Sequence, residues 1–151
     1  MTGVNEMDPR ISISDLEPLA IEAMRGLGKY LDSVNLNVSL CELIKIRASQ
    51  INGCAYCIQL HTEKARAQGE TEQRIYALSA WKESPLFTRE ERAVLALTEE
   101  VTMISNQGLS KEVYDKGLEL FGDHGLAQYI MQIITINAWN RIALSTRMRH
   151  K

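Results

Sequence analysis

Three side chains in the first half of the chain form a group suited to thiol chemistry. Cys54 and Cys57 lie three residues apart, and His61 follows four residues after the second cysteine. On a helix, residues with this spacing share one face, with Cβ atoms about 5–6 Å apart, so a small rotamer change would close a disulfide. The free N–H groups at a helix N-terminus favour thiolate over thiol, and a neighbouring imidazole can take or return the proton. The pattern predicts a redox-active dithiol with a histidine proton carrier.

Glu42 is a candidate fourth member of this group. It lies twelve residues before Cys54, and Gly53 interrupts the helical pattern between them. If Gly53 ends one helix and the next one folds back, the carboxylate would reach the cysteines and orient His61. A second interpretation stays open, because Glu42 also follows Ser39 by three residues and could bond the Ser39 N–H in a capping box.

The sequence also allows less reactive roles for the cysteines. They could be structural, or they could supply three zinc ligands together with His61, although no second Cys-x-x-Cys completes a closed tetrahedral site. Covalent haem attachment requires a histidine directly after the second cysteine, where Ile58 stands. A thioredoxin-type motif belongs to a βαβ unit, and the pattern here is helical. We therefore expect neither a metal nor a cofactor, and we expect the third cysteine, Cys41, to be a small packing residue.

Helical periodicity runs through most of the chain, and these elements must position the site. Capping-box patterns begin at Ser14, Ser39 and Thr88, and glycines end several of the expected helices. The expected helices cover about residues 14–34, 39–51, 54–68, 71–83, 88–104, 110–121 and 123–147. No convincing strand pattern is present. The sequence therefore predicts an all-α fold of about six or seven helices, forming a single domain over residues 1–151.

Composition excludes several classes of protein. The 151 residues favour one domain, and 17 Lys+Arg against 19 Asp+Glu give a net charge of −2, which argues against a nucleic-acid partner bound through phosphates. No apolar run approaches the roughly 20 residues that cross a membrane, and no secretory signal is readable in residues 1–10. An odd count of three cysteines in such a chain is typical of cytoplasmic thiols. We expect a cytoplasmic protein without a membrane partner.

The last expected helix, over residues 123–147, is apolar around much of its circumference. Such a helix lies at the centre of a core or in an oligomer interface. Four side chains with polar groups interrupt it, namely Asn137, Trp139, Asn140 and Arg141. Because buried amide and guanidinium groups need partners, we expect a hydrogen-bonded network here, within the chain or across subunits.

The residues around the cysteines are similar to those of a known family. The stretch Gln50–Thr62, QINGCAYCIQLHT, resembles the core signature of the AhpD-like alkylhydroperoxidases, within the carboxymuconolactone decarboxylase superfamily. Further segments resemble the short, single-domain branch of that family, namely Trp81–Thr88, Glu91–Leu97 and Ile136–Ala143. The resemblance covers about residues 36–142. The arrangement Glu-x11-Cys-x2-Cys-x3-His is specific, whereas an isolated Cys-x-x-Cys is not.

The resemblance implies an all-helical fold that assembles into homotrimers or homohexamers, and thiol-dependent reduction of hydrogen peroxide or organic hydroperoxides. By position, Cys57 matches the cysteine that attacks the peroxide, Cys54 the resolving cysteine, and Glu42 with His61 the proton-relay pair. The residues alone leave the order of the two cysteines open. The helix dipole favours Cys54 as the more acidic thiol, whereas proximity to His61 favours Cys57. Tyr56 stands where some relatives carry a second histidine.

The resemblance also implies a redox partner. An external dithiol would reduce the disulfide, and in the best-known relatives this reductant is a lipoylated adaptor. The decarboxylases of the superfamily lack the cysteine pair, which argues against decarboxylation of a lactone. The sequence therefore predicts a thiol-dependent peroxidase. The alternative is a redox-sensing or structural oligomer whose disulfide forms reversibly with little turnover.

Overall fold

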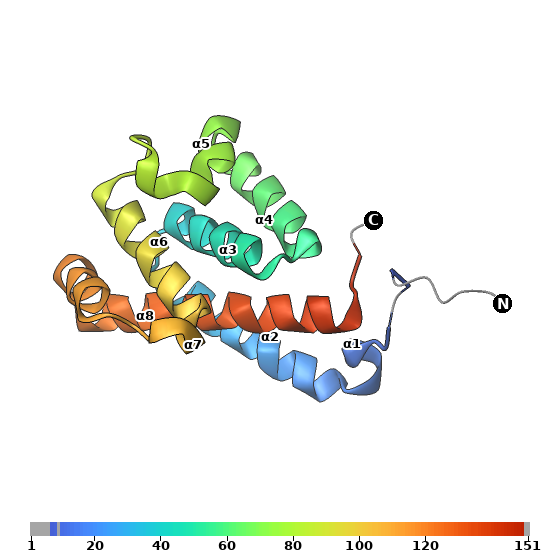
Figure 1. Cartoon of the computed structure of the whole chain (residues 1–151). Helices are drawn as coiled ribbons and strands as arrows, with labels where there is room; N and C mark the ends of the chain where they lie inside the picture. The colour runs from blue at the N-terminus through green and yellow to red at the C-terminus, as the bar shows by residue number, and fades with distance from the viewer. Residues whose placement is uncertain (1–6, 9, 150–151) are drawn as a thin grey trace.

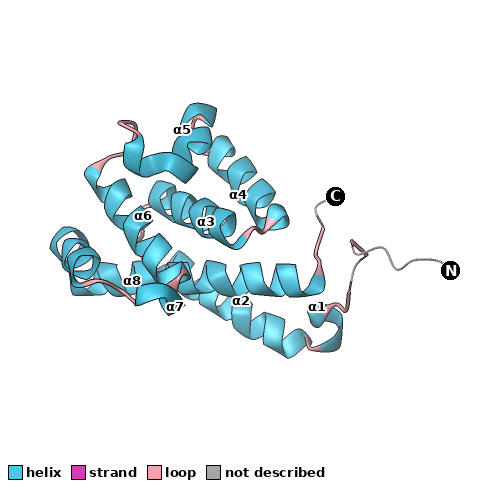
Figure 2. Ribbon diagram, in the orientation of Figure 1, coloured by secondary structure: helices cyan, strands magenta, loops and turns pink. Residues whose placement is uncertain are grey.

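The chain folds into helices joined by short connections. The structure is a computed structural model that describes residues 7–8 and 10–149. Over these residues it contains no strand (Figure 2). The elements, in chain order, are α1 Ile13–Leu16, α2 Pro18–Ser33, α3 Val38–Asn52, α4 Ala55–Ala67, α5 Glu72–Ala77, the 3-10 helix η1 Leu78–Glu83, α6 Arg89–Thr102, α7 Ile104–Gln107 and α8 Lys111–Thr146. The predicted all-α fold is confirmed.

The helix α3 is the central element of the fold. It packs against α4, α6 and α8, while α2 packs along α8 (Figure 1). Two hydrophobic clusters meet on it. One joins α3 to α6 and α8 through residues such as Ile44, Val94 and Ile133, and the other joins α3 to η1 and α6 through residues such as Leu43 and Leu78. Because α3 is buried on two sides, its position is fixed from both directions.

Three expected helices are divided in the structure, one of them, over residues 71–83, into α5 and η1. Glu17 separates α1 from α2 with a non-helical backbone, directly before Pro18. The proline ring crowds the helical conformation of the residue before it, which accounts for the non-helical backbone of Glu17. Met103 similarly separates α6 from α7. The expected stop at Gly122 is a sharp break within α8, where φ is 69° and ψ is 178°. The divisions at Glu17, at Met103 and between α5 and η1 explain why more helices form than the six or seven expected, whereas α8 joins two expected helices across Gly122.

The helix caps decide between the two interpretations of Glu42. The capping box of Thr88 and Glu91 is present. The predicted cap of α3, however, is wrong. Asn37 caps this helix by accepting a hydrogen bond from Leu40 N at 3.1 Å. The helix thus begins before Ser39, and Glu42 lies more than one turn inside it, where its carboxylate contacts Lys45 and His61.

The turn between α3 and α4 reverses the chain. Gly53 adopts a left-handed conformation, with φ 71° and ψ 32°, and its N–H bonds the last carbonyls of α3. Cys54 N then donates to Ser49 O at 3.0 Å, which completes the C-terminal cap. As a result α4 folds back against α3 (Figure 1).

None of the helices formed by the described residues has both the length and the apolar character needed to cross a bilayer.

The Gly53 turn yields a prediction about stability. A Cβ at Gly53 would meet no atom within 4 Å, so the cost of Gly53→Ala is conformational, because φ is positive. We expect a loss of about 1 kcal/mol in the free energy of unfolding, measured by urea denaturation. Gly26→Ala is the matched control. Gly26 lies in α2 with equal space and no positive φ, and its substitution should add about 0.5–1 kcal/mol. A stabilising Gly53→Ala would contradict this description of the turn.

Candidate active site

The two cysteines of the motif are joined at the start of α4. Cys54 and Cys57 form a disulfide, with a Cα–Cα distance of 5.3 Å. Cys54 is the N-cap residue, and its Sγ accepts a hydrogen bond from Cys57 N at 3.3 Å. Only 1% of Cys54 and 3% of Cys57 is exposed. The spacing therefore brings the two sulfurs together at a helix N-terminus, as the sequence predicts.

His61 and Glu42 meet across the two helices. His61 lies one turn after Cys57 on α4, and Glu42 lies on α3. The distance from His61 Nδ1 to Glu42 Oε2 is 3.4 Å, and 12% and 6% of the two side chains are exposed. Within the described part of the chain, neither of these buried atoms makes a hydrogen bond of regular geometry. The contact between them is thus the available path for a proton.

Lys45 forms an ion pair with Glu42 and favours its ionised form. Its Nζ lies 3.1 Å from Glu42 Oε1, one turn along α3. Burial opposes ionisation of the carboxyl group, but the contact with His61 and the ion pair with Lys45 outweigh it. Together they hold the pKa of Glu42 below its usual range. Sequence reasoning missed Lys45, although its spacing of three residues from Glu42 on one helix is a usable signal.

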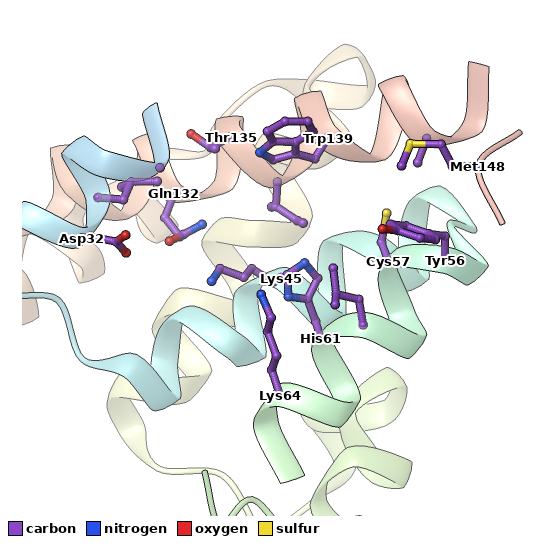
Figure 3. Close-up of a pocket in the computed structure, with 15 residues that line it drawn as sticks. Asp32, Lys45, Tyr56, Cys57, His61, Lys64, Gln132, Thr135, Trp139 and Met148 are labelled. Atoms are coloured by element: carbon purple, nitrogen blue, oxygen red, sulfur yellow. The ribbon is translucent and has the colours of Figure 1, made fainter. Parts of the chain in front are cut away.

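A cavity of about 360 Å³ opens onto the site. Cys57 and His61 line it from α4, and α8 supplies the opposite wall (Figure 3). Cys54 does not line this cavity. It lines a different one of about 250 Å³, together with Gly53 and Arg147. The two sulfurs of the disulfide therefore border different cavities, and only Cys57 shares its cavity with the imidazole.

A network of buried amides fixes the end of α3 next to the cysteines. Asn52 Nδ2 donates to Asn137 Oδ1 and to Asn140 Oδ1, each at 2.9 Å. Asn140 Nδ2 in turn donates to Ser49 Oγ at 3.0 Å. Arg141 joins the network by donating to Asn137 Oδ1 at 2.9 Å. These bonds tie the last turn of α3 to α8.

The predicted network thus exists within the chain, but its membership differs from the prediction. Trp139 faces the 360 Å³ cavity instead (Figure 3). The sequence did not point to Ser49 and Asn52 as partners, since each lies 85 or more residues from its partner on α8.

Cys41 lies apart from the disulfide. Its thiol is free and buried in the cluster between α3, α6 and α8. Burial is the main cause that raises its pKa to about 11, so it stays protonated near neutral pH. This agrees with the predicted packing role. Among the described residues, no group of three His, Cys, Asp or Glu side chains is placed to hold a metal ion.

Comparisons with known proteins agree with this geometry. The sequence profile of the carboxymuconolactone decarboxylase family matches residues 18–100. Uncharacterized protein YdfG of Bacillus subtilis (strain 168) is 40% identical over 139 residues, which cover 92% of this chain and 95% of the relative.

Solved structures are similar as well. The crystal structure of a protein of unknown function from Agrobacterium tumefaciens, suggested to be the antioxidant defence protein AhpD, matches with a TM-score of 0.92 and 37% identity. The match covers 95% of this chain and 99% of that one. The debrominase Bmp8 shares the fold at a TM-score of 0.76 and 20% identity, over 91% of this chain and 74% of its own.

The chain therefore belongs to the carboxymuconolactone decarboxylase family. Within this family it is AhpD-like, which confirms the resemblance seen around the cysteines. Family membership and the Cys54–Cys57 pair together support a general peroxidase-like role.

The Glu42 contacts generate a prediction about pH. Because the folded-state pKa of Glu42 is lowered, its ionised form stabilises the fold above the ordinary carboxyl pKa, and this contribution is lost as the pH falls through the folded value. Glu42→Gln should therefore lower the free energy of unfolding at pH 7 by about 1 kcal/mol or more. The deficit should shrink below about pH 4.

Glu22→Gln, at an exposed carboxylate on α2, is the control and should change little at either pH. Denaturant titrations at pH 7 and at low pH measure both variants. A Glu42→Gln deficit that grows on acidification would contradict the assigned charge of Glu42.

Proposed function

We propose that this protein is a thiol-dependent peroxidase that reduces hydrogen peroxide or organic hydroperoxides through Cys54 and Cys57. One observation carries the proposal. Cys57 and His61 border the same cavity, the sulfur of Cys54 is bonded to that of Cys57, and the carboxylate of Glu42 contacts the imidazole. This arrangement supplies a nucleophile, a proton carrier and a resolving thiol within about two turns of helix.

The first step oxidises Cys57. His61 takes the proton of the Cys57 thiol, and the resulting thiolate attacks the outer oxygen of the hydroperoxide. The S–O bond forms as the O–O bond breaks, which leaves Cys57 as a sulfenic acid. The departing alkoxide takes a proton from His61 and leaves as an alcohol, or as water when the substrate is hydrogen peroxide. The carboxylate of Glu42 stabilises the imidazolium that forms in between.

The second step closes the disulfide. Cys54 attacks the sulfenic sulfur of Cys57, and the departing hydroxide is protonated to water. The hydrogen bond from Cys57 N to Cys54 Sγ favours the thiolate form that this attack needs. An external dithiol then reduces the disulfide through a mixed disulfide and is itself oxidised. A lipoylated adaptor and the reducing thiols of the cytoplasm are both of the right chemistry for this partner.

The assignment of Cys57 as the attacking thiol is supported by access to the imidazole. Cys54 is closer to the N-terminus of α4, where the helix dipole favours a thiolate. However, it does not line the cavity that His61 lines. An attacking thiol must lose its proton where the peroxide binds, and only Cys57 meets both conditions. Cys54 is suited to the resolving role, since that role requires contact with Cys57 rather than with substrate.

A turnover assay with cumene hydroperoxide and excess dithiothreitol tests the proposal. We expect Cys57→Ser to abolish turnover, and His61→Ala to lower kcat/KM by about 100-fold or more. Cys41→Ala is the control and should keep wild-type activity, because Cys41 does not line the 360 Å³ cavity. Full activity of Cys57→Ser would refute the role assigned to that residue.

The same assay separates the peroxidase from the redox-sensing or structural oligomer. In that alternative one equivalent of peroxide closes the disulfide, but excess dithiothreitol brings no sustained turnover of the wild type.

A further inference from the structure

The 360 Å³ cavity is much larger than hydrogen peroxide requires. A water molecule occupies about 30 Å³ in the liquid, and sites for organic ligands begin at about 300 Å³. Beyond Cys57 and His61 the walls are largely apolar, with contributions from Leu31, Leu60, Ile136 and Trp139. The cavity therefore has room for an organic group attached to the hydroperoxide.

One end of this cavity carries amino groups. Its lysine and aspartate lining residues are Lys45 from α3, Lys64 from α4 and Asp32 from α2. Figure 3 shows the side chains of Lys45 and Lys64 extending toward the same end of the cavity. Both also line the adjoining hollow between α2 and α3, so they border a common space.

The two lysines differ in their partners. Lys45 is engaged by Glu42 at 3.1 Å. Lys64, in contrast, forms no ion pair with any of the described residues. Asp32 lines the wall contributed by α2 and is likewise without an ion pair to that part of the chain. The ammonium of Lys64 is thus available to an anion that enters the cavity.

Helix geometry sets the distance between this ammonium and the reactive sulfur. Lys64 follows Cys57 by seven residues, and His61 lies between them. Seven residues make two turns of helix, so Lys64 shares the face of Cys57 and begins about 10 Å further along α4. A ligand that spans the cavity would meet the thiol at one end and the ammonium at the other.

We propose that Lys64 selects organic hydroperoxides that carry a carboxylate at the end opposite to the peroxide group. The inference rests on the proposed peroxidase function and names the substrate class of the same site. The apolar walls hold the hydrocarbon body, Cys57 receives the hydroperoxide, and Lys64 pairs with the carboxylate. Asp32 opposes this preference by repelling the same anion.

The test compares cumene hydroperoxide with its para-carboxylate. The measured quantity is the preference, which is the kcat/KM for the carboxylate divided by that for the neutral compound. We expect wild type to prefer the carboxylate, Lys64→Gln to lower the preference by about threefold to fivefold, and Lys64→Glu to reverse it. Asp32→Asn should raise the preference. High salt should reduce it in wild type, since the pair is close to solvent.

Lys29→Gln is the matched control. Lys29 is an exposed lysine of α2 that lines none of the cavities described above, and removing it changes the net charge of the protein by the same amount. The Lys29→Gln variant should show the same preference as wild type. A wild-type preference near one, or an equal loss in Lys29→Gln and Lys64→Gln, would overturn the inference while leaving the peroxidase proposal intact.

A binding measurement separates the two proposals if neither hydroperoxide is turned over. That outcome would refute the peroxidase function itself. Calorimetry then measures the affinity for the para-carboxylate of cumyl alcohol, which is the unreactive reduction product. This affinity reports binding of the anion without any turnover. Weaker binding to Lys64→Gln than to Lys29→Gln supports the role of Lys64, and equal binding to both overturns it.

Discussion

The antiparallel packing of α3 against α4 positions every group of the candidate site. Glu42 lies about three turns before the Gly53 reversal, and His61 lies about two turns after it, so the two side chains meet when the helices fold together. The same reversal makes Cys54 the N-cap of α4 and thereby exposes both sulfurs to the free N–H groups of a helix start. The amide network around Asn52 fixes this reversal against α8. The chemistry of the site therefore depends on one turn and the contacts that hold it.

Burial and neighbouring charges determine which groups in and around the site are ionised. A buried thiol without help becomes a weaker acid, as Cys41 illustrates with a pKa raised to about 11. Glu42 is buried as well, but the contact with His61 and the charge of Lys45 keep it ionised. An ionised carboxylate behind an imidazole lets the ring accept a proton and hold it briefly. Lys45 thus acts on the site through Glu42, whereas Lys64 faces the cavity directly.

Much of this site follows from local sequence patterns. The spacing of Cys54, Cys57 and His61 fixes their common face once α4 forms, and Gly53 marks the reversal that brings Glu42 to them. The predicted cap of α3 at Ser39 is wrong, because Asn37 and Ser39 are both good N-caps and only the folded backbone chooses between them.

Other parts of the site depend on contacts between distant segments, which no local pattern reveals. The cavity is one of them, because its walls come from α2, α3, α4 and α8. The partners of the buried amides are another, because Asn52 and Asn140 are separated by 88 residues. Periodicity predicted that Asn137 and Asn140 need partners, but the packing of α3 on α8 determines which partners they find.

The central claim is that Cys57, rather than Cys54, attacks the peroxide. Trapping of the sulfenic acid by dimedone, followed by mass spectrometry, tests it most directly. In a Cys54→Ser variant treated with one equivalent of cumene hydroperoxide, the adduct should form on Cys57, because the sulfenic acid cannot resolve. In a Cys57→Ser variant, no adduct should form on Cys54. An adduct on Cys54 that forms as fast as the one on Cys57 would contradict the assignment.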